Sequence, residues 1–457
     1  MAIFDVLNIG RSGLLAQQRA LKTNGDNIAN VNTPGYTRQR TIMTSVPESG
    51  GYGVQVTGVE QVVDEFLETR LQGQTSTSAE TSTRRDVLDA VQSLFPVGDT
   101  SIGSALQAFF ASANQVATSP EDVSARTDLL NRAEALATQI RGAAQGLAAT
   151  QRENDGRLAS GVSDANGLLG TIAQLNQGIV QTEANGGDAN ALRDQRRQAL
   201  GQLAGLLGVR TTEQADGSVD VATTSGVSLV SGADAKTLAG KPSATLGLDG
   251  NALTDIGVVA PDGSLIPLGS NPGGELGARL ALRDGDLPGT ASDLDLLATT
   301  LRDSVNAVQT NAAGRDLDGL VGSALFAGTG ASDLSVALTD PRGIAAAQST
   351  VSGDNSNALA LVAVGSATQG ALSGSTLGDY FGTVQTKVGV AARAADDSAT
   401  VQDNLLASVT AQRDAVSGVT LEDEFTDLIR FQRGFQASAQ LITVGDQLLQ
   451  DVLAMVQ

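Results

Sequence analysis

The sequence predicts a mainly α-helical protein with a small β-rich insert, and three observations carry this prediction. Apolar residues recur at seven-residue spacing near both ends of the chain, and helical periodicity fills most of the interval between them. From about residue 208 to 271 the pattern changes to short β-branched runs separated by Asp-Gly turns. The 457 residues are enough for about three domains at roughly 150 residues each.

The first helix is predicted to fill the N-terminal thirty residues. Its apolar positions repeat every seventh residue, with small or polar residues such as Gly10, Gln17 and Asn24 between them. The repeated positions, which form a candidate assembly seam, are Leu7, Leu14, Leu21 and Ile28. Pro34 followed by Gly35 then predicts a type II turn, because proline sets φ at the second turn position and glycine accepts a positive φ at the third.

The middle of the chain alternates between helical and extended patterns. Residues 37–63 are predicted to be extended or irregular, and a long helical region is expected from about 64 to 207. Within it, Ser119 before Pro120 predicts a helix N-cap. Helices are expected again from about residue 275, from 377 to 416, and from 421 to 456, with loops and one short strand over 316–353.

The last helix has the clearest pattern in the chain. Thr420 and Asp423 form a capping-box-like start. A seven-residue repeat and two further seam positions follow: Leu421, Leu428, Phe435, Ile442, Leu449 and Val456, with Phe425 and Leu453. Periodicity alone favours a helix buried within its own fold, but the matching helix at the other end of the chain favours a coiled-coil-like pair of termini. Because one partner helix covers only part of such a stripe, we expect both termini to be mobile in the free monomer.

Composition excludes several classes of function. With 29 Lys and Arg against 50 Asp and Glu, the formal charge is −21, which argues against binding nucleic acid or anionic lipid. The absence of His and Cys excludes His-based triads, thiol nucleophiles, disulfides and nearly all zinc or iron sites. No phosphate-binding loop or nucleophile elbow is present, and the Asp-Gly turn at Asp316–Gly319 lacks the remaining ligands of a calcium loop. We therefore predict no catalytic residues, no metal and no cofactor.

Neither a cleaved signal peptide nor membrane insertion is expected. The N-terminus has no basic segment and carries an acid at Asp5. The longest clean apolar run, near 358–364, is far shorter than a membrane span.

Two terminal motifs resemble the signatures of bacterial flagellar axial proteins, which include rod, hook and hook-associated proteins. They are NIANVNTPGY at 27–36 and LIRFQRGFQASA at 428–439. Four further stretches are similar to the hook-associated protein 1 family: YTRQ at 36–39, SPEDVSAR at 119–126, LRDQRR at 192–197 and GELGA at 274–278. The family's turn motif then falls on Asn30, Asn32, Thr33, Pro34, Gly35 and Tyr36.

This resemblance implies a nested layout with three layers. The terminal helices of 1–60 and 395–457 would pair as a coiled-coil-like inner domain, 61–208 with 274–394 would form a helical middle domain, and 209–273 an outer β-rich domain. The outer segment is shorter than in other members of the family, which argues against a second outer domain.

The resemblance also implies a structural adaptor between hook and filament. Such a protein is exported through the flagellar secretion apparatus without a cleaved signal peptide and assembles outside the cell. Its implied partners are copies of itself in a ring or helical homo-oligomer, the hook protein, the second hook-associated junction protein, and a cytoplasmic export chaperone on the C-terminal helix.

Three alternatives belong to other classes. A hook or distal-rod axial protein is the nearest, and the helical middle stretches argue against it. A secreted carboxylate hydrolase needs two acids facing one cleft, and no motif marks such a pair. A cytoskeletal coiled-coil protein needs heptads over most of its length, whereas these are confined mainly to the ends.

Overall fold

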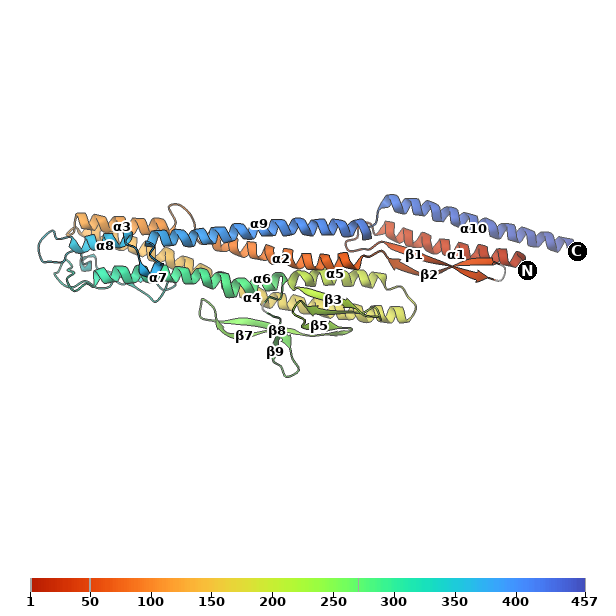
Figure 1. The fold of residues 1–457 in the computed structure, drawn as a ribbon, viewed down its shortest axis with the longest axis horizontal. Helices are drawn as coiled ribbons and strands as arrows, with labels where there is room; N and C mark the ends of the chain where they lie inside the picture. Colours follow the sequence, from red (N-terminus) through yellow and green to blue (C-terminus); the bar gives the residue numbers. More distant parts are fainter. Residues whose placement is uncertain (1, 49–50, 270, 457) are drawn as a thin grey trace.

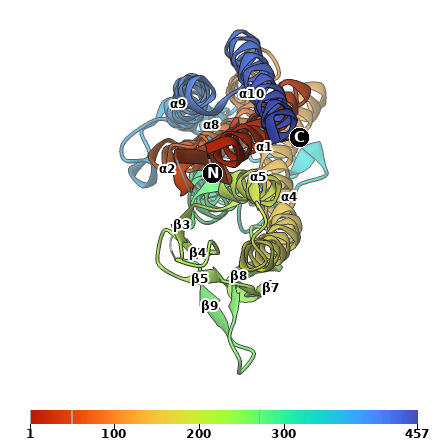
Figure 2. The same ribbon diagram turned by 90° about the vertical axis from the view of Figure 1, so that its right-hand side faces the viewer.

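The computed structural model describes residues 2–48, 51–269 and 271–456 of the chain. The molecule is a long rod of helices that run along one axis, with a β-rich projection on one side (Figure 1). Both chain termini lie at the same end of the rod, beside a β-hairpin. Viewed along the rod, the β-rich part extends away from the helices rather than covering them (Figure 2).

The terminal region consists of two helices and one hairpin. Helix α1 (Ala2–Ala29) packs along α10 (Leu421–Val456), and strands β1 (Gln39–Glu48) and β2 (Gly51–Gln61) pair antiparallel beside α1. Among the helices and strands, α1 is the one element with which the described part of α10 makes an extensive contact. The segment expected to be extended or irregular is this hairpin. Its two strands pair in a regular antiparallel register with a single shift at Ile42/Met43.

The helical body supplies most of the rod. Its α-helices are α2 (Glu65–Ser93), α3 (Ile102–Thr118), α4 (Val123–Ala184), α5 (Asn190–Leu206), α6 (Gly274–Ala281), α7 (Leu287–Gln309), α8 (Ser356–Ser366) and α9 (Leu377–Ser417). A π-helical turn (Leu282–Asp286) joins α6 to α7, and short 3₁₀ turns lie at Pro341–Gly343 and Gly370–Leu372. The small strands β10 (Phe326–Ala327) and β11 (Ser335–Val336) pair beside the body.

The β-rich projection lies between α5 and α6 and contains two antiparallel sheets. The first has the strand order β3 (Val209–Glu213), β4 (Val219–Thr223), β5 (Ser228–Ser231), β6 (Asp234–Ala235). The second has the order β7 (Leu238–Leu246), β8 (Ala252–Val259), β9 (Leu265–Pro267). The predicted class, mainly α with a small β-rich insert, is thus confirmed.

Two large hydrophobic cores lie along the rod, with a small third cluster around Leu88 and Leu282, and the long helix α4 contributes to both large ones. One core surrounds residues such as Phe109, Leu136 and Leu297, and the other joins Leu169 of α4 to the β-rich projection. Fully buried leucines along one face of α4 pack into both cores. The terminal pair of helices lies at one end of this helical body (Figure 1).

The predicted start of α4 is wrong by one turn. Ser119 ends α3 instead, and the helix begins after Asp122, whose carboxylate accepts a hydrogen bond from the backbone N–H of Ser124 at 2.8 Å. Asp122 takes the capping role predicted for Ser119, because a short aspartate side chain readily accepts a hydrogen bond from the unpaired backbone N–H groups of the first helical turn. The predicted start of α10 agrees with the structure, where the Thr420 hydroxyl donates to Asp423 at 2.6 Å.

No helix in the described ranges is both long enough and apolar enough to cross a membrane.

Candidate functional site

The two terminal helices run antiparallel, and glycines bring their backbones close together. A Cβ built on Gly10 would lie 2.9 Å from Cγ1 of Ile442, and one built on Gly434 would lie 2.8 Å from Cδ of Gln17. A Cβ on Gly445 would lie 2.8 Å from Cδ2 of Leu7. Because these distances are shorter than ordinary contacts, a larger residue at any of the three glycines would force the facing side chain, or the helix that carries it, to shift.

The predicted seam residues lie on this contact or beside it, and most are only half-buried. On α1 the half-buried positions are Leu7, Leu14, Leu21 and Ile28, and on α10 they are Leu428, Phe435, Ile442 and Leu449. Three other α10 positions are exposed, namely Leu421 at 43%, Phe425 at 50% and Leu453 at 61%. The side chain of Val456 lies outside the described residues. The apolar face of α10 is therefore covered by α1 on one side and exposed on the others.

A buried carboxylate at the base of α10 is held by the first helix and the segment after it. Glu424 is 1% exposed, and its Oε2 accepts a hydrogen bond from Nδ2 of Asn27 at 3.1 Å and another from Nδ2 of Asn24. Its Oε1 accepts from Nε of Arg38 at 2.7 Å. A buried carboxylate is costly unless it is paired and hydrogen-bonded, and here three donors satisfy it. This cluster, Glu424 with Asn24, Asn27 and Arg38, is called the Glu424 cluster below.

The turn motif supports the same cluster from outside. Gly35 has a φ of 80°, and the backbone N–H of Tyr36 donates to the carbonyl of Thr33 at 3.2 Å, as the predicted type II turn requires. The turn directs the Tyr36 hydroxyl to Oδ1 of Asn27, at 2.9 Å. Burial, and then the nearby carboxylates, raise the pKa of the Tyr36 phenol well above its ordinary value, so it stays protonated and donates.

The remaining residues of the motif have local roles or face solvent. Oγ1 of Thr33 donates to Oδ1 of Asn30 at 3.1 Å, and Nδ2 of Asn30 donates to the carbonyl of Asp26 at 2.9 Å. These bonds close the end of α1. Asn32 and Pro34 are exposed.

A second polar cluster joins the terminal region to the body at the start of α5. Oδ1 of Asp194 accepts from the Thr37 hydroxyl at 2.6 Å, from Nη2 of Arg197 at 2.6 Å and from Nε2 of Gln61 at 2.9 Å. Nδ2 of Asn190 donates to the carbonyl of Val59 at 2.8 Å. Thr37 precedes β1 and Gln61 ends β2. The bonds therefore connect both strands of the hairpin to α5 and fix the position of the hairpin on the body.

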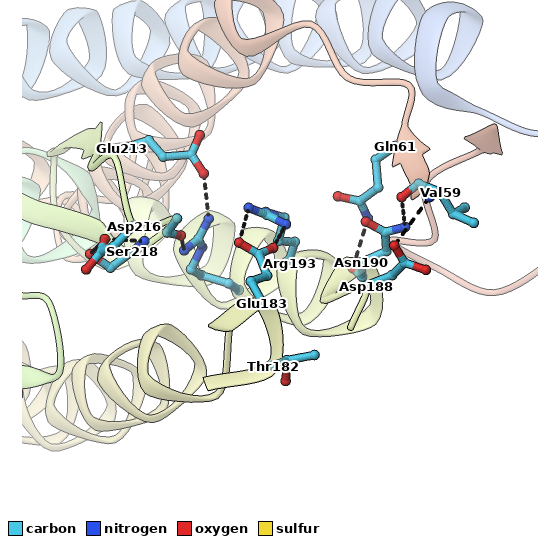
Figure 3. A network of polar contacts seen from close by, with 12 residues as sticks. Val59, Gln61, Thr182, Glu183, Asp188, Asn190, Arg193, Glu213, Asp216 and Ser218 are labelled. Carbon is cyan, nitrogen blue, oxygen red and sulfur yellow. Dashed lines mark hydrogen bonds and ion pairs between the residues drawn. The ribbon is translucent and has the colours of Figure 1, made fainter. Parts of the chain in front are cut away.

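The same junction continues along the turn between α4 and α5 (Figure 3). Asp188 lies next to β2, where its Oδ1 accepts the backbone N–H of Val59 at 3.3 Å, and its Oδ2 receives Nη2 of Arg19 from α1 at 2.7 Å. Further along, the guanidinium of Arg193 pairs with Glu183 across the helical hairpin. The body therefore contacts the terminal region through hydrogen bonds and ion pairs more than through a shared apolar core.

Sequence reasoning missed the two acids at the centres of these clusters, Glu424 and Asp194. Asn24 stands at a seam position, and a polar residue there can signal a specific partner on the facing helix. An acid in the first turn of a helix is, however, ordinarily explained by the helix dipole, so Glu424 has no distinctive local pattern. Its partners come from α1 and the segment just after it, nearly four hundred residues away in the sequence, and only the fold brings them to Glu424.

Two hollows of similar size flank the hairpin. One, of about 710 Å³, lies between β2, α2 and α5, and the other, of about 720 Å³, lies between α1 and β2. Across the described ranges, no group of three or more acidic side chains is arranged to hold a metal ion.

Comparison with known proteins places the chain in a family. The profile of the flagellar hook-associated protein FlgK helical domain matches residues 88–326, just over half of the chain. The chain belongs to the FlgK family. The profile of flagella basal body rod proteins matches residues 7–37, and that of the flagellar basal body rod FlgEFG protein C-terminal region matches 412–455. Glu424, Asn24 and Asn27 thus join the two segments that match basal body rod proteins.

Full-length relatives and a solved structure agree with this assignment. The chain is 27% identical to flagellar hook-associated protein 1 of Salmonella typhimurium, with 98% of this chain and 99% of that protein covered. It is 28% identical to the protein of the same description from Bacillus subtilis, with 98% of each covered. The flagellar hook junction protein FlgK of Burkholderia pseudomallei matches the fold with a TM-score of 0.69 at 17% identity, over 76% of this chain and 100% of that one. The chain is therefore a member of a family of structural flagellar proteins.

Proposed function

We propose that this protein is a structural adaptor that joins the flagellar hook to the filament and assembles by association of its terminal helices. The observation that carries this proposal is the open seam: among the described elements α10 has its one extensive contact with α1, while apolar side chains such as Phe425 and Leu453 stay exposed. Apolar surface of this extent on a helix favours further helix packing. The terminal pair is then the inner domain, and the helical body and β-rich projection are the middle and outer domains.

The partners follow from this role. They are copies of the same chain in a ring or helical homo-oligomer, the hook protein on one side and the second hook-associated junction protein on the other. A cytoplasmic chaperone would cover α10 before export, since its apolar residues would otherwise be exposed. The protein would reach the outside of the cell through the flagellar secretion apparatus without a cleaved signal peptide, and it would have no catalytic role.

A hook or distal-rod protein is the second candidate, because the terminal matches extend to basal body rod proteins. The helical-domain match over residues 88–326 favours the junction instead.

The test compares seam and surface substitutions in a motile strain. Phe435→Asp and Ile442→Asp each place a charge against α1, and we expect the body to melt as in the wild type while filament subunits leak into the medium. Gln436→Asp, at an exposed neighbouring position, is the matched control and should leave motility intact. Immunogold labelling of the tagged protein should mark the hook–filament junction. Normal filaments from both seam variants, or a label elsewhere on the flagellum, would contradict the proposal.

A further inference from the structure

Two surfaces of the terminal region remain open after α1 and α10 have paired. The first is an apolar face on the second half of α10, here called the tail stripe. It consists of Leu441, Val444, Leu448, Val452 and Met455. The first four are each 44–45% exposed and Met455 is 81% exposed. Their spacing of three or four residues puts them on one face of the helix, over a length of about 20 Å.

The second surface is the hollow of about 720 Å³ between α1 and β2, here called the α1–β2 groove. Its apolar lining includes Leu15, Val54 and Val56, and Leu15 is 56% exposed. Arg11 and Arg19 also line it. From Asn8 to Arg19 the lining of α1 runs for roughly 17 Å at 1.5 Å per residue, close to the length of the tail stripe.

The helix segments that carry the two surfaces have opposite charge. The groove is also lined by Asp188, which pairs with Arg19, so Arg11 is the charge of its lining that has no ion pair among the described residues. The second half of α10, from residue 434 onward, contains Asp446 and Asp451 and no Lys or Arg. At 3.6 residues per turn Asp451 flanks the tail stripe, whereas Asp446 lies on the opposite face of the helix. Residues 6–25 of α1 contain Arg11, Arg19 and Lys22 and no Asp or Glu. Arg11, Lys22, Asp446 and Asp451 form no ion pair with the described part of the chain, although all four are exposed. Complementary charge of this kind favours one orientation of docking and disfavours like-with-like contact.

One copy of the chain cannot join its own two surfaces. Gly10, Gly13 and Gln17 of α1 face α10, whereas Leu15 and Arg11 turn toward the groove beside β2. The single α10 helix already occupies the opposite side of α1, so the groove is left for a helix from elsewhere. Because each copy has one groove and one stripe, docking between copies leaves a free surface at each end of the pair. Such head-to-tail contacts generate rings or helical assemblies.

We propose that the tail stripe of one copy docks in the α1–β2 groove of the next copy. This inference rests on the proposed self-association of the terminal helices and specifies the two faces that meet. Leu441, Leu448 and their neighbours then cover Leu15 and Val54, and Asp451, which flanks the stripe, lies near the positive charges of α1, Arg11 and Lys22.

Disulfide trapping tests the contact directly, because the native chain contains no cysteine. Full-length Leu15→Cys protein is mixed with full-length Leu441→Cys, Leu448→Cys or Met455→Cys protein and oxidised. We expect a covalent heterodimer with at least one of the three, and a ladder of oligomers when both substitutions are in one chain. Leu15→Cys mixed with Val390→Cys, an exposed site on α9, is the control and should give no more heterodimer than chance collision. Equal yields from the control and all three test pairs would overturn the proposal.

Charge reversal tests the same contact without oxidation. Arg11→Glu with Lys22→Glu, and separately Asp451→Lys, should weaken self-association in low salt severalfold by sedimentation velocity. An equimolar mixture of the two variants, or all three changes in one chain, should restore it. Asp397→Lys on α9 is the matched control and should associate as the wild type does. Unchanged association of both reversed variants, or a loss that neither combination restores, would overturn the proposal.

The outcome is separable from that of the junction role. Wild-type protein that labels the junction but stays monomeric, or reversed variants that assemble there normally, would refute these faces and leave the adaptor function standing. Wild-type protein absent from the junction would refute the adaptor function, whatever the sedimentation result.

Discussion

The helical body and the terminal pair use similar apolar residues in different ways. In the body, Phe109, Leu136 and Leu297 are fully buried, within a core to which several helices contribute. In the terminal pair, Phe435 and Ile442 are only half-buried, because each lies between two helices and solvent. The body is therefore a finished fold, while the terminal pair has apolar surface left for other molecules. The predictions below test this difference, from the largest expected effect to the smallest.

The largest effect is expected from truncating a leucine in the body. Leu136→Ala leaves a cavity in a close-packed core and should lower the free energy of unfolding of the body by about 2 to 5 kcal/mol. Ile442→Ala, its counterpart in the terminal pair, should leave the body's thermal melt unchanged. Calorimetry of both variants, followed by limited proteolysis, checks the comparison. We expect protease to remove the terminal helices first in every variant, and equal resistance of termini and body would contradict the distinction.

The Glu424 cluster should be the strongest single contact within the terminal pair. Glu424→Ala leaves the donors of Asn24, Asn27 and Arg38 without their acceptor and should weaken the docking of α10 by about 2 to 3 kcal/mol, since Arg38 is partly exposed. Hydrogen exchange of the α10 amides should accelerate while exchange in the body is unchanged. Glu424→Gln keeps the shape of the side chain and one acceptor oxygen, so its α10 amides should exchange at rates between those of the wild type and of Glu424→Ala. If both variants exchange as the wild type does, the cluster does not hold α10.

A smaller and more local effect is expected at the turn. Gly35→Val forces a β-branched residue into the left-handed region at a cost of about 1 to 2 kcal/mol, although the nearest atom to its Cβ would be 3.9 Å away. We expect the body to melt normally and junction assembly to suffer, because Tyr36 would no longer reach Asn27. Gly35→Asn, which tolerates this conformation better, should assemble more normally than the valine variant. If the Gly35→Val change also lowered the melting temperature of the body, the turn would support the body and not the terminal region alone, which would contradict the prediction.

The smallest effect is expected at Glu68, beside the second polar cluster. Burial raises the pKa of the Glu68 carboxyl, against a lowering influence from Arg197 and Arg413. A raised pKa in the folded state means that the stability from this group is present at low pH and is lost as pH rises through the folded value. Glu68→Gln should thus raise the melting temperature at pH 7 by about 1 °C, and the difference should vanish below pH ~4, where the wild-type carboxyl is also neutral. A larger benefit at pH 4 than at pH 7 would contradict the sign.

Much of the fold could be predicted because its signals are local. The bounds of α10 and its capping contact between Thr420 and Asp423 follow from periodicity and first-turn chemistry, and the positive φ of Gly35 follows from the Pro-Gly pair. The start of α4 was harder, because Ser119 and Asp122 are both good caps and the choice between them depends on where α3 ends.

The sequence by itself determined where the terminal helices lie and which of their faces are apolar, because these properties depend on residue spacing along one helix. Only the tertiary structure decided which residues stand at the centre of the contact. Gly10 and Gly434 occupy the centre of this contact, with the leucines beside them, because a residue without a Cβ lets the two backbones approach. It also decided that Glu424 is buried, since its three donors come from segments nearly four hundred residues away and the carboxylate can leave water only where all of them converge.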